Sequence, residues 1–379
     1  MGDRIDPTLL LVSRRAFYPV HAAVLRELAS RYIVDVVVLG AAEADVPDVH
    51  RSLGWASPTQ LREQGIGVEL LPAAGSTWAD DAEAIRTCLA SVDPDLVWVQ
   101  EEPVDLITLE VLATYRRTPR RPRIGCAVCE NIFSRGDVRT RLRRRHLWPR
   151  LDVLLAVAQE SAQGIRAVGM PRSIPSVDLV AGIDAPGDLE PARRRRDDER
   201  FRVGFVGRLV PEKGWYDAVA AVAAVPDALL AIAGDGPESS ALTTALASSA
   251  LKGRADYVGL LAKDELWAFY RSLDCLVVPS KTTERWKEQF GAVIADAFAC
   301  GVPVVGYDSG AIPEVIGEAG LIIPEGDVEG LVRGLVTLRD DDMLRAKLAH
   351  AGRERYEREF SVEAYARKVA AAFGLAPRV

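Results

Sequence analysis

The chain has 379 residues, of which 49% are hydrophobic and 27% are charged, a composition typical of soluble globular proteins. Its net charge of −7 argues against a dedicated nucleic-acid-binding protein, and no stretch approaches the roughly 18 uninterrupted apolar residues of a membrane-spanning helix. Because domains usually run to about 100–200 residues, the length predicts two domains, each with its own core.

The amino-terminal residues 1–7 are polar and lack the basic segment followed by an apolar one that marks a secretion signal. The cysteines are sparse and odd in number, which is typical of proteins from a reducing compartment. They are Cys88, Cys126, Cys129, Cys275 and Cys300. We therefore expect a cytoplasmic protein.

In the first half, short apolar runs alternate with helical patterns, which is typical of a parallel α/β sheet. The predicted strands are residues 9–13, 34–40, 68–71, 96–99, 124–128, 153–157 and 177–180. The predicted helices are residues 21–31, 79–90, 106–115 and 159–168. Several of the strands are apolar almost throughout, which indicates helices on both faces of the sheet.

Residues 185–200 (APGDLEPARRRRDDER) combine two prolines, a glycine and a dense charge cluster, a pattern that predicts a linker. The strand–helix alternation then resumes, and residues 340–373 form a charged helical tail. The predicted strands of this half are residues 201–206, 228–233, 257–258, 275–279, 303–306 and 321–323.

We therefore predict an amino-terminal domain over residues 1–184, a second domain over 201–360, and a terminal helix over 361–379 that packs back on the first domain. Two Rossmann-like, doubly wound α/β domains of this kind are expected to bind a ligand in the cleft between them, near the carboxyl ends of the strands.

The first motif that carries chemistry is VGFVGRLVPEKGW, at residues 203–215. Its buried strand ends at Gly207, and Arg208 and Lys213 then precede a helical pattern. The planar fork of an arginine, the point charge of a lysine and the free N–H groups of a helix end together suit a phosphate group. The alternative is a solvated loop with incidental charges.

The second motif is AGDGPE, at residues 233–238, which ends the next strand. Gly234 and Gly236 permit a tight turn and a close approach of the backbone. The motif is neither a dinucleotide fingerprint nor a P-loop, so the kinase and NTPase classes have no support in the sequence.

The third and most specific motif spans residues 278–317 and contains Glu288-Gln289-Phe290-Gly291 followed by a small-residue helix over 292–300. We place Glu288 at the start of this helix, where its carboxylate accepts sugar hydroxyls while the adjacent N–H groups face an anion. Asp296 follows eight residues later, so we expect both acids to lie on one helical face.

Taken in order, GRLVPEKG, AGDGPE, YVGLL, EQFGAVIADAFACGVPVV and SGAIPEVIG resemble the donor domain of family-4 glycosyltransferases. The resemblance covers roughly residues 203–327 and implies the GT-B fold, two Rossmann-like domains that face a cleft. The first half is similar in architecture and, more loosely, around Glu130-Asn131-Ile132. The resemblance further implies a retaining transfer that needs no metal and no protein base.

This resemblance implies that Arg208 and Lys213 bind the diphosphate of a sugar nucleotide. It also implies that Glu288 binds hydroxyls of the transferred sugar and that Asp296 binds the ribose. The second acid of the family pattern is normally Glu, whereas this chain has Asp296. The other residues implied to bind the donor are Gly207, Gly234, Gly236, Gly259, Leu260, Gln289, Phe290 and Gly291. The family often has a Gly-Gly loop after the first strand, where this chain has RRAFYP at residues 14–19.

On the acceptor side, several polar residues follow strands of the first half and either orient an acceptor or cap helices. They are His21, Glu101, Glu102, Glu130 and Asn131. We interpret Asp93-Pro94-Asp95 as a turn because it precedes a strand, and Cys126-x-x-Cys129 lacks the second pair of a zinc site.

The segment from Arg139 to Arg150, RTRLRRRHLWPR, is basic and includes Leu142, Leu147 and Trp148. It either rests weakly on an anionic membrane, holds an anionic acceptor, or is a solvated basic face.

The sequence thus predicts a glycosyltransferase that uses a nucleoside-diphosphate sugar and an acceptor hydroxyl, with no cofactor. A cell-surface glycan, a lipid-linked sugar and an antibiotic-type small molecule all remain open as acceptors. The alternatives are a nucleotide-sugar epimerase or hydrolase on the same fold, and a non-catalytic nucleotide-sugar-binding protein.

Overall fold

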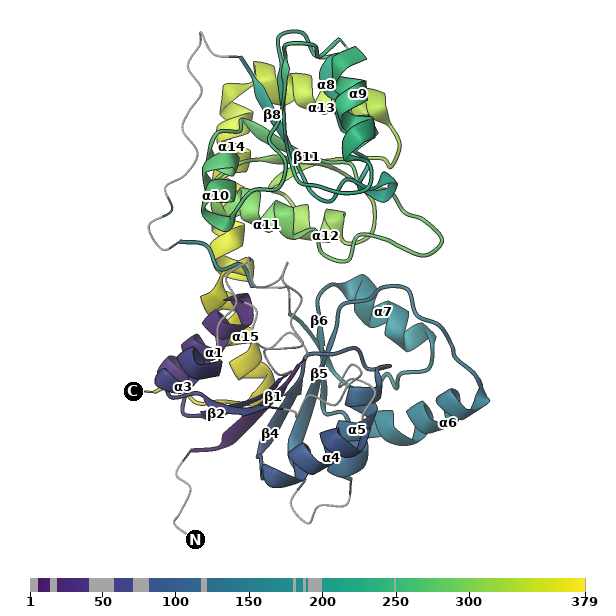
Figure 1. Ribbon diagram of the computed structural model, residues 1–379, viewed down its shortest axis with the longest axis vertical. Coiled ribbons are helices and arrows are strands. Elements are labelled where there is room, and N and C mark those ends of the chain that lie inside the picture. Colours follow the sequence, from purple (N-terminus) through teal and green to yellow (C-terminus); the bar gives the residue numbers. More distant parts are fainter. Residues whose placement is uncertain are drawn as a thin grey trace. The chain divides into compact units, whose positions relative to one another are not determined.

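The computed structural model divides the chain into two compact units (Figure 1). Unit 1 comprises Met1–Asp184 and Val362–Val379, and unit 2 comprises Ala185–Ser361. The residues that the structure describes are 6–13, 19–40, 58–70, 82–116, 121–179, 182–186, 189, 200–248 and 250–378. The loop at 14–18 and most of the expected linker lie outside them.

Within its described residues, unit 1 has a seven-stranded sheet in the order β3-β2-β1-β4-β5-β6-β7, and every pair is parallel. The strands are β1 (Thr8–Val12), β2 (Asp35–Gly40), β3 (Gly67–Leu70), β4 (Leu96–Val99), β5 (Arg123–Val128), β6 (Val153–Ala156) and β7 (Ser176–Asp178). All seven predicted strands are confirmed. Strands β1, β4 and β6 are buried throughout, because helices cover both faces of the sheet.

The helices of unit 1 pack in two layers, one on each face of this sheet (Figure 1). One layer consists of α4 (Ala82–Ser91), α5 (Leu106–Thr114), α6 (Val138–Leu147) and α7 (Gln159–Ala167). The other consists of α1 (Pro19–Arg31), α3 (Pro58–Glu63) and α15 (Val362–Phe373). Helix α15 packs against α1, and the Phe373 ring lies so close to Gly125 of β5 that a Cβ there would clash with it. The end of the chain therefore completes the core of unit 1.

Unit 2 has, among its described residues, a six-stranded parallel sheet in the order β10-β9-β8-β11-β12-β13. The strands are β8 (Arg202–Val206), β9 (Leu229–Ala233), β10 (Ala255–Tyr257), β11 (Cys275–Val278), β12 (Val304–Tyr307) and β13 (Gly320–Ile323). The six predicted strands are confirmed. The helices are α8 (Trp215–Ala223), α9 (Ser239–Ser248), α10 (Lys263–Arg271), α11 (Ala292–Ala299), α12 (Ile312–Ile316), α13 (Val328–Asp340) and α14 (Asp342–Arg355).

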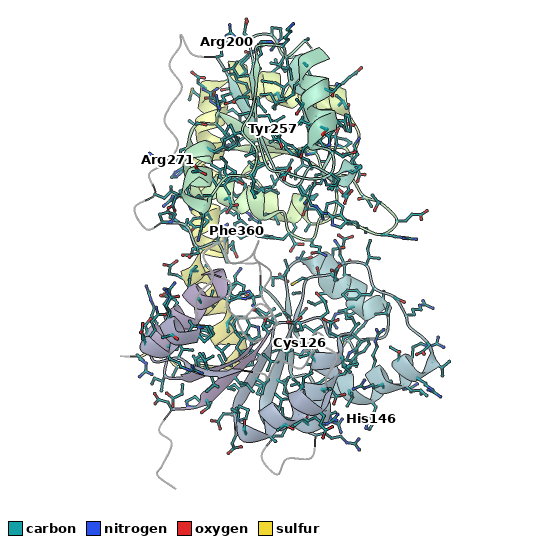
Figure 2. All side chains as sticks on the ribbon, in the orientation of Figure 1. Cys126, His146, Arg200, Tyr257, Arg271 and Phe360 are labelled. Carbon is teal, nitrogen blue, oxygen red and sulfur yellow. The ribbon has the colours of Figure 1, made fainter. Side chains whose placement is uncertain are left out.

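The charged helical tail expected over residues 340–373 consists of several helices, and the terminal helix predicted from residue 361 begins at Val362. Helix α13 ends at Asp340, α14 follows, and a π-helical turn over Tyr356–Phe360 ends unit 2. Phe360, labelled in Figure 2, is buried there against Phe290, with ring centroids 5.8 Å apart. Ser361 has extended backbone angles, so α15 begins as a separate helix that belongs to unit 1.

Each sheet has one point at which the strand order reverses. In unit 1 it lies between β1 and β4, and in unit 2 between β8 and β11. In open α/β sheets the loops at the carboxyl ends of two such strands diverge to opposite faces and leave a crevice where ligands bind. The loops that follow β8 and β11 carry GRLVPEKG and the segment around Glu288, respectively.

Candidate active site

The loops after β8 and β11 are joined to each other at the carboxyl edge of the unit 2 sheet. The N–H of Lys281 donates to the carbonyl of Glu212 at 2.7 Å. Gly214 has a φ of +69°, and a Cβ there would overlap the Pro279 carbonyl oxygen, so the motif requires glycine at this position. The close approach brings Lys213 beside the residues that follow β11.

Lys213 and Glu288, which are 75 residues apart in the sequence, form an ion pair. The Lys213 ammonium donates to Glu288 Oε2 at 2.8 Å, and the hydroxyl of Ser280 donates to the same oxygen at 2.9 Å. The Glu288 side chain is buried and that of Lys213 is partly exposed. The indole of Trp286 covers the ammonium, whose nitrogen lies 4.7 Å from the ring centroid.

Arg208 lies at the same edge, directly after Gly207, but its environment differs. Its side chain is exposed and forms no ion pair within the part of the chain that the structure describes. The guanidinium is therefore available to an anion in solution, whereas the charge of Lys213 is already balanced by Glu288.

Glu288 precedes helix α11 and is not part of it. The helix starts at Ala292, after Gly291, which adopts a left-handed conformation with φ +76°. The expectation that Glu288 and Asp296 share one helical face is therefore wrong, because the left-handed residue turns the chain away from the helix axis. The N–H groups of Gln289, Phe290 and Gly291 donate no hydrogen bond to any group that the structure describes.

The loop after β12 packs against the backbone of Glu288. The N–H of Ala311 donates to the Glu288 carbonyl at 2.9 Å. Gly310 has a φ of +56°, and a Cβ there would overlap the Glu288 backbone. The SGAIPEVIG motif thus fixes the backbone position of this acid.

Asp296 lies within α11 and is mostly buried. The hydroxyl of Tyr270, on α10, lies 3.4 Å from its Oδ2. Burial raises the pKa of the Asp296 carboxyl to about 7, against the opposing effects of the Tyr270 hydrogen bond and the Lys263 charge. A carboxyl group so placed changes its charge near neutral pH.

The AGDGPE turn packs on the GRLVPEKG loop by backbone contacts. A Cβ on Gly234, whose φ is +137°, would overlap the Gly207 carbonyl, and one on Gly236 would press on the backbone of Leu209. The Gly234 N–H donates to the Gly259 carbonyl at 2.8 Å. Leu260, next along that loop, has 68% of its surface exposed. All the residues expected to bind the donor thus lie on the loops and the helix at this edge of unit 2.

Residues 188–355 match the family model described as Glycosyl transferases group 1. The chain carries a glycosyl transferases group 1 domain. Its curated relatives include the 2-deoxystreptamine N-acetyl-D-glucosaminyltransferase of Streptomyces fradiae, 34% identical over 40% of this chain and 39% of the relative. Another is the 2-deoxystreptamine glucosyltransferase of Streptomyces kanamyceticus, 34% identical over 49% of this chain and 51% of the relative. The chain thus spans about half the length of these relatives or less.

Solved structures resemble the whole chain rather than the domain alone. Anabaena Alr3699/HepE, solved in complex with UDP and glucose, matches 97% of this chain and 99% of its own, with a TM-score of 0.69 and 19% identity. Sucrose-phosphate synthase from Thermosynechococcus elongatus matches 97% and 98%, with a TM-score of 0.71 and 18% identity. With its two parallel-sheet α/β units, the chain has the GT-B fold.

Unit 1 lies outside the residues matched by the family model, and it contains the acceptor-side candidates. Glu102 follows β4, and its Oε1 accepts from the N–H groups of Cys129 and Glu130 at 2.8 and 3.0 Å. Its Oε2 is buried and has no hydrogen-bond partner within the described residues. Burial, together with the charges of Glu130 and Asp105, raises the pKa of Glu102 to about 7.

The other acceptor-side candidates differ in how far they are buried. Glu101 and Asn131 are buried, and the Asn131 amide lies 3.5 Å from Glu160 Oε2 as a donor. Glu130 is exposed, and His21 is partly buried on α1. Glu102, Glu130 and Asn131 are close together because β4 and β5 are neighbours in the sheet.

The residues set aside on sequence grounds have structural partners. Asp95 Oδ2 accepts from the N–H of Thr8 at 2.9 Å and so links the beginnings of β1 and β4. Cys126 is buried, and its thiol donates to the Glu101 carbonyl. Across the described ranges, no three His, Cys, Asp or Glu side chains are grouped so that they could hold a metal ion.

The basic segment from Arg139 to Arg150 forms α6 and a short 3-10 turn. Leu147 and Trp148 are buried and are therefore not available for contact with a membrane surface. Leu142 is exposed, and His146 lies on the outside of unit 1 (Figure 2). No helix among the described residues is long and apolar enough to cross a bilayer.

Sequence reasoning missed three residues that contact the acids of the site. Ser280 and Trp286 surround the Lys213–Glu288 pair, and Tyr270 bonds to Asp296. Ser280 and Trp286 belong to the most specific motif, so their position in the sequence could have identified them as site residues. Tyr270 is part of an ordinary amphipathic helix, and no pattern in the sequence distinguishes it.

Proposed function

We propose that the protein is a retaining, metal-independent glycosyltransferase that moves a sugar from a nucleoside diphosphate to an acceptor hydroxyl. The observation that carries the proposal is the Lys213–Glu288 pair beside the N–H groups of Gln289, Phe290 and Gly291, at the strand-order reversal of unit 2. In this arrangement, the ammonium of Lys213 and the three N–H groups can bind phosphate, and the Glu288 carboxylate beside them can bind sugar hydroxyls. Both lie at the point where open α/β sheets bind ligands.

The chemistry follows from the leaving group. The bond between C1 of the sugar and the diphosphate oxygen breaks, and the negative charge that develops on this oxygen, beside the two charges that the diphosphate already carries, needs fixed donors. In the proposal, Lys213 and the exposed Arg208 supply them, as the resemblance to family-4 enzymes implies. The acceptor oxygen forms the new bond to C1 on the same face, and its proton passes to the departing phosphate oxygen.

The remaining donor contacts are assigned by position. Glu288 accepts hydrogen bonds from hydroxyls of the transferred sugar, and Asp296 accepts them from the ribose. The backbone of Gly259 and Leu260 contacts the base.

On the acceptor side, Glu102 is the strongest candidate, because its Oε2 is buried without a partner among the described residues. A hydroxyl of the acceptor would satisfy this oxygen.

The first experiment is a thermal-shift panel of UDP, GDP and ADP, since a ligand that binds only the folded protein raises its melting temperature. A shift with at least one of them is expected. UDP-glucose and GDP-mannose are then incubated with and without acceptors, and release of the nucleoside diphosphate is measured. The acceptor panel begins with 2-deoxystreptamine, named in the two Streptomyces relatives, and with a lipopolysaccharide core, named in a relative from Rhizobium meliloti.

Three outcomes separate the proposal from its alternatives. Release that depends on an acceptor, with a product of the donor's anomeric configuration by NMR, supports a retaining transferase. Consumption without any acceptor supports an epimerase or a hydrolase. Tight binding of a nucleotide sugar with no turnover across the panel supports a non-catalytic binding protein.

A further inference from the structure

Trp286 is a second contact of Lys213, beside Glu288. The Lys213 nitrogen lies 4.7 Å from the centroid of its ring, within the range of a cation–π interaction. Glu288 approaches the same ammonium as a hydrogen-bond acceptor. Among the described residues, the ammonium therefore contacts a carboxylate and an aromatic ring.

A compact turn fixes the backbone at Trp286. Thr283 Oγ1 accepts from the N–H of Trp286 at 2.9 Å and from that of Arg285 at 3.3 Å. The N–H of Thr283 in turn donates to the Trp286 carbonyl at 2.8 Å. The turn lies between β11 and α11, and β11 is the sheet neighbour of β8, whose loop carries Lys213. Two adjacent loops thus bring the ring to the ammonium.

The two neighbours act differently on an incoming anion. An ammonium has three N–H donors, and a carboxylate both occupies one of them and neutralises the charge. A ring face attracts the charge through its quadrupole and leaves the net charge unchanged. It also restricts a flexible four-carbon side chain, which lowers the entropy lost when the ammonium binds.

We propose that Trp286 is a positioning residue that holds the Lys213 ammonium in place for the second phosphate of the donor. The inference rests on the proposed function, because it assumes that Lys213 binds a diphosphate. It adds that the ring sets the preference for a nucleoside diphosphate over a nucleoside monophosphate. A residue that only stabilised the loop would affect both ligands equally.

The test is a double-mutant cycle between Trp286→Leu and Lys213→Met, with affinities for UDP, UMP, GDP and GMP measured by calorimetry. Trp286→Leu is expected to weaken diphosphate binding about fivefold to tenfold and to leave monophosphate binding within about twofold. Trp286→Phe keeps a ring face and is expected to retain most of the affinity. In the Lys213→Met background, Trp286→Leu is expected to have no further effect on diphosphate binding.

Urea unfolding of each variant shows whether it is folded. If Lys213→Met does not fold, the role of Trp286 is tested by the ratio of diphosphate to monophosphate affinity in Trp286→Leu alone. An equal loss for both ligands, or a loss that persists without Lys213, would overturn the role of Trp286 while leaving the donor site intact. If the unsubstituted protein binds none of the four nucleotides, the proposed function fails and the inference fails with it.

Discussion

The ammonium of Lys213 donates to Glu288 Oε2 at 2.8 Å, so two groups assigned to different parts of the donor neutralise each other. The carboxylate is buried, which strengthens the attraction and makes each partner depend on the other. Substitution of either residue therefore changes the stability of the fold as well as the binding of an anion, and the two effects need separate measurements.

We expect Lys213→Ala to lower kcat by about 10²–10³, the scale of a lost oxyanion-type contact. It also leaves Glu288 buried without its countercharge, so the free energy of unfolding should fall by about 1–3 kcal/mol. Arg208→Ala is the matched control. Because Arg208 is exposed and has no ion pair within the described residues, it should lose turnover without a loss of stability in urea. Unchanged turnover in either variant would contradict the diphosphate assignment.

Glu288→Gln should impair sugar transfer more than nucleotide binding. The amide oxygen can still accept the Ser280 hydroxyl, but it no longer provides a charged acceptor for the sugar. We expect kcat to fall about 100-fold and the Kd for the nucleoside diphosphate to change by less than about threefold. Steady-state kinetics and calorimetry on the same preparation measure the two. An equal loss in both would show that Glu288 acts on the diphosphate instead.

Asp296→Asn tests the raised pKa of that carboxyl. With a pKa of about 7 in the folded chain and about 4 in the unfolded chain, the folded state holds the proton more tightly, so stability falls as pH rises from 4 to 7. The asparagine variant lacks this penalty. Relative to the unsubstituted protein, it should gain about 1–2 kcal/mol at pH 8 and nothing at pH 4. Urea unfolding at the two pH values checks this, and an equal difference at both would show that the carboxyl does not titrate in this range.

Gly214→Ala should be severely destabilising, because its Cβ would overlap the Pro279 carbonyl in a loop that already has a positive φ. We expect a loss of about 3 kcal/mol or more. Gly253→Ala is the matched control, with a φ of +77° and nothing within 4 Å of the added Cβ, so only the backbone cost of about 1 kcal/mol remains. Equal losses would mean that the close approach of the two loops is unimportant.

Much of the fold could be predicted from the sequence, because strands buried on both faces read as continuous apolar runs. LLLV in β1 and LVWV in β4 are examples, and all thirteen predicted strands are present. The terminal helix was predicted from residue 361 and begins at Val362, but the break between α13 and α14 and the π-helical turn over Tyr356–Phe360 were not predicted. The packing of Phe360 in unit 2 and of Phe373 in unit 1 assigns the two sides of Ser361 to different units.

The sequence by itself determined which residue types stand at the carboxyl ends of the strands, since motifs such as GRLVPEKG combine cations with glycines that a close approach of the backbone requires. The tertiary structure decided which of them meet. Lys213 reaches Glu288 because β8 and β11 are neighbours, and Glu288 lies off helix α11 because Gly291 turns the chain in a left-handed conformation. Trp286 covers Lys213 for the same reason. Local propensity acts over a few residues, whereas the pairing of strands joins residues that are 75 positions apart.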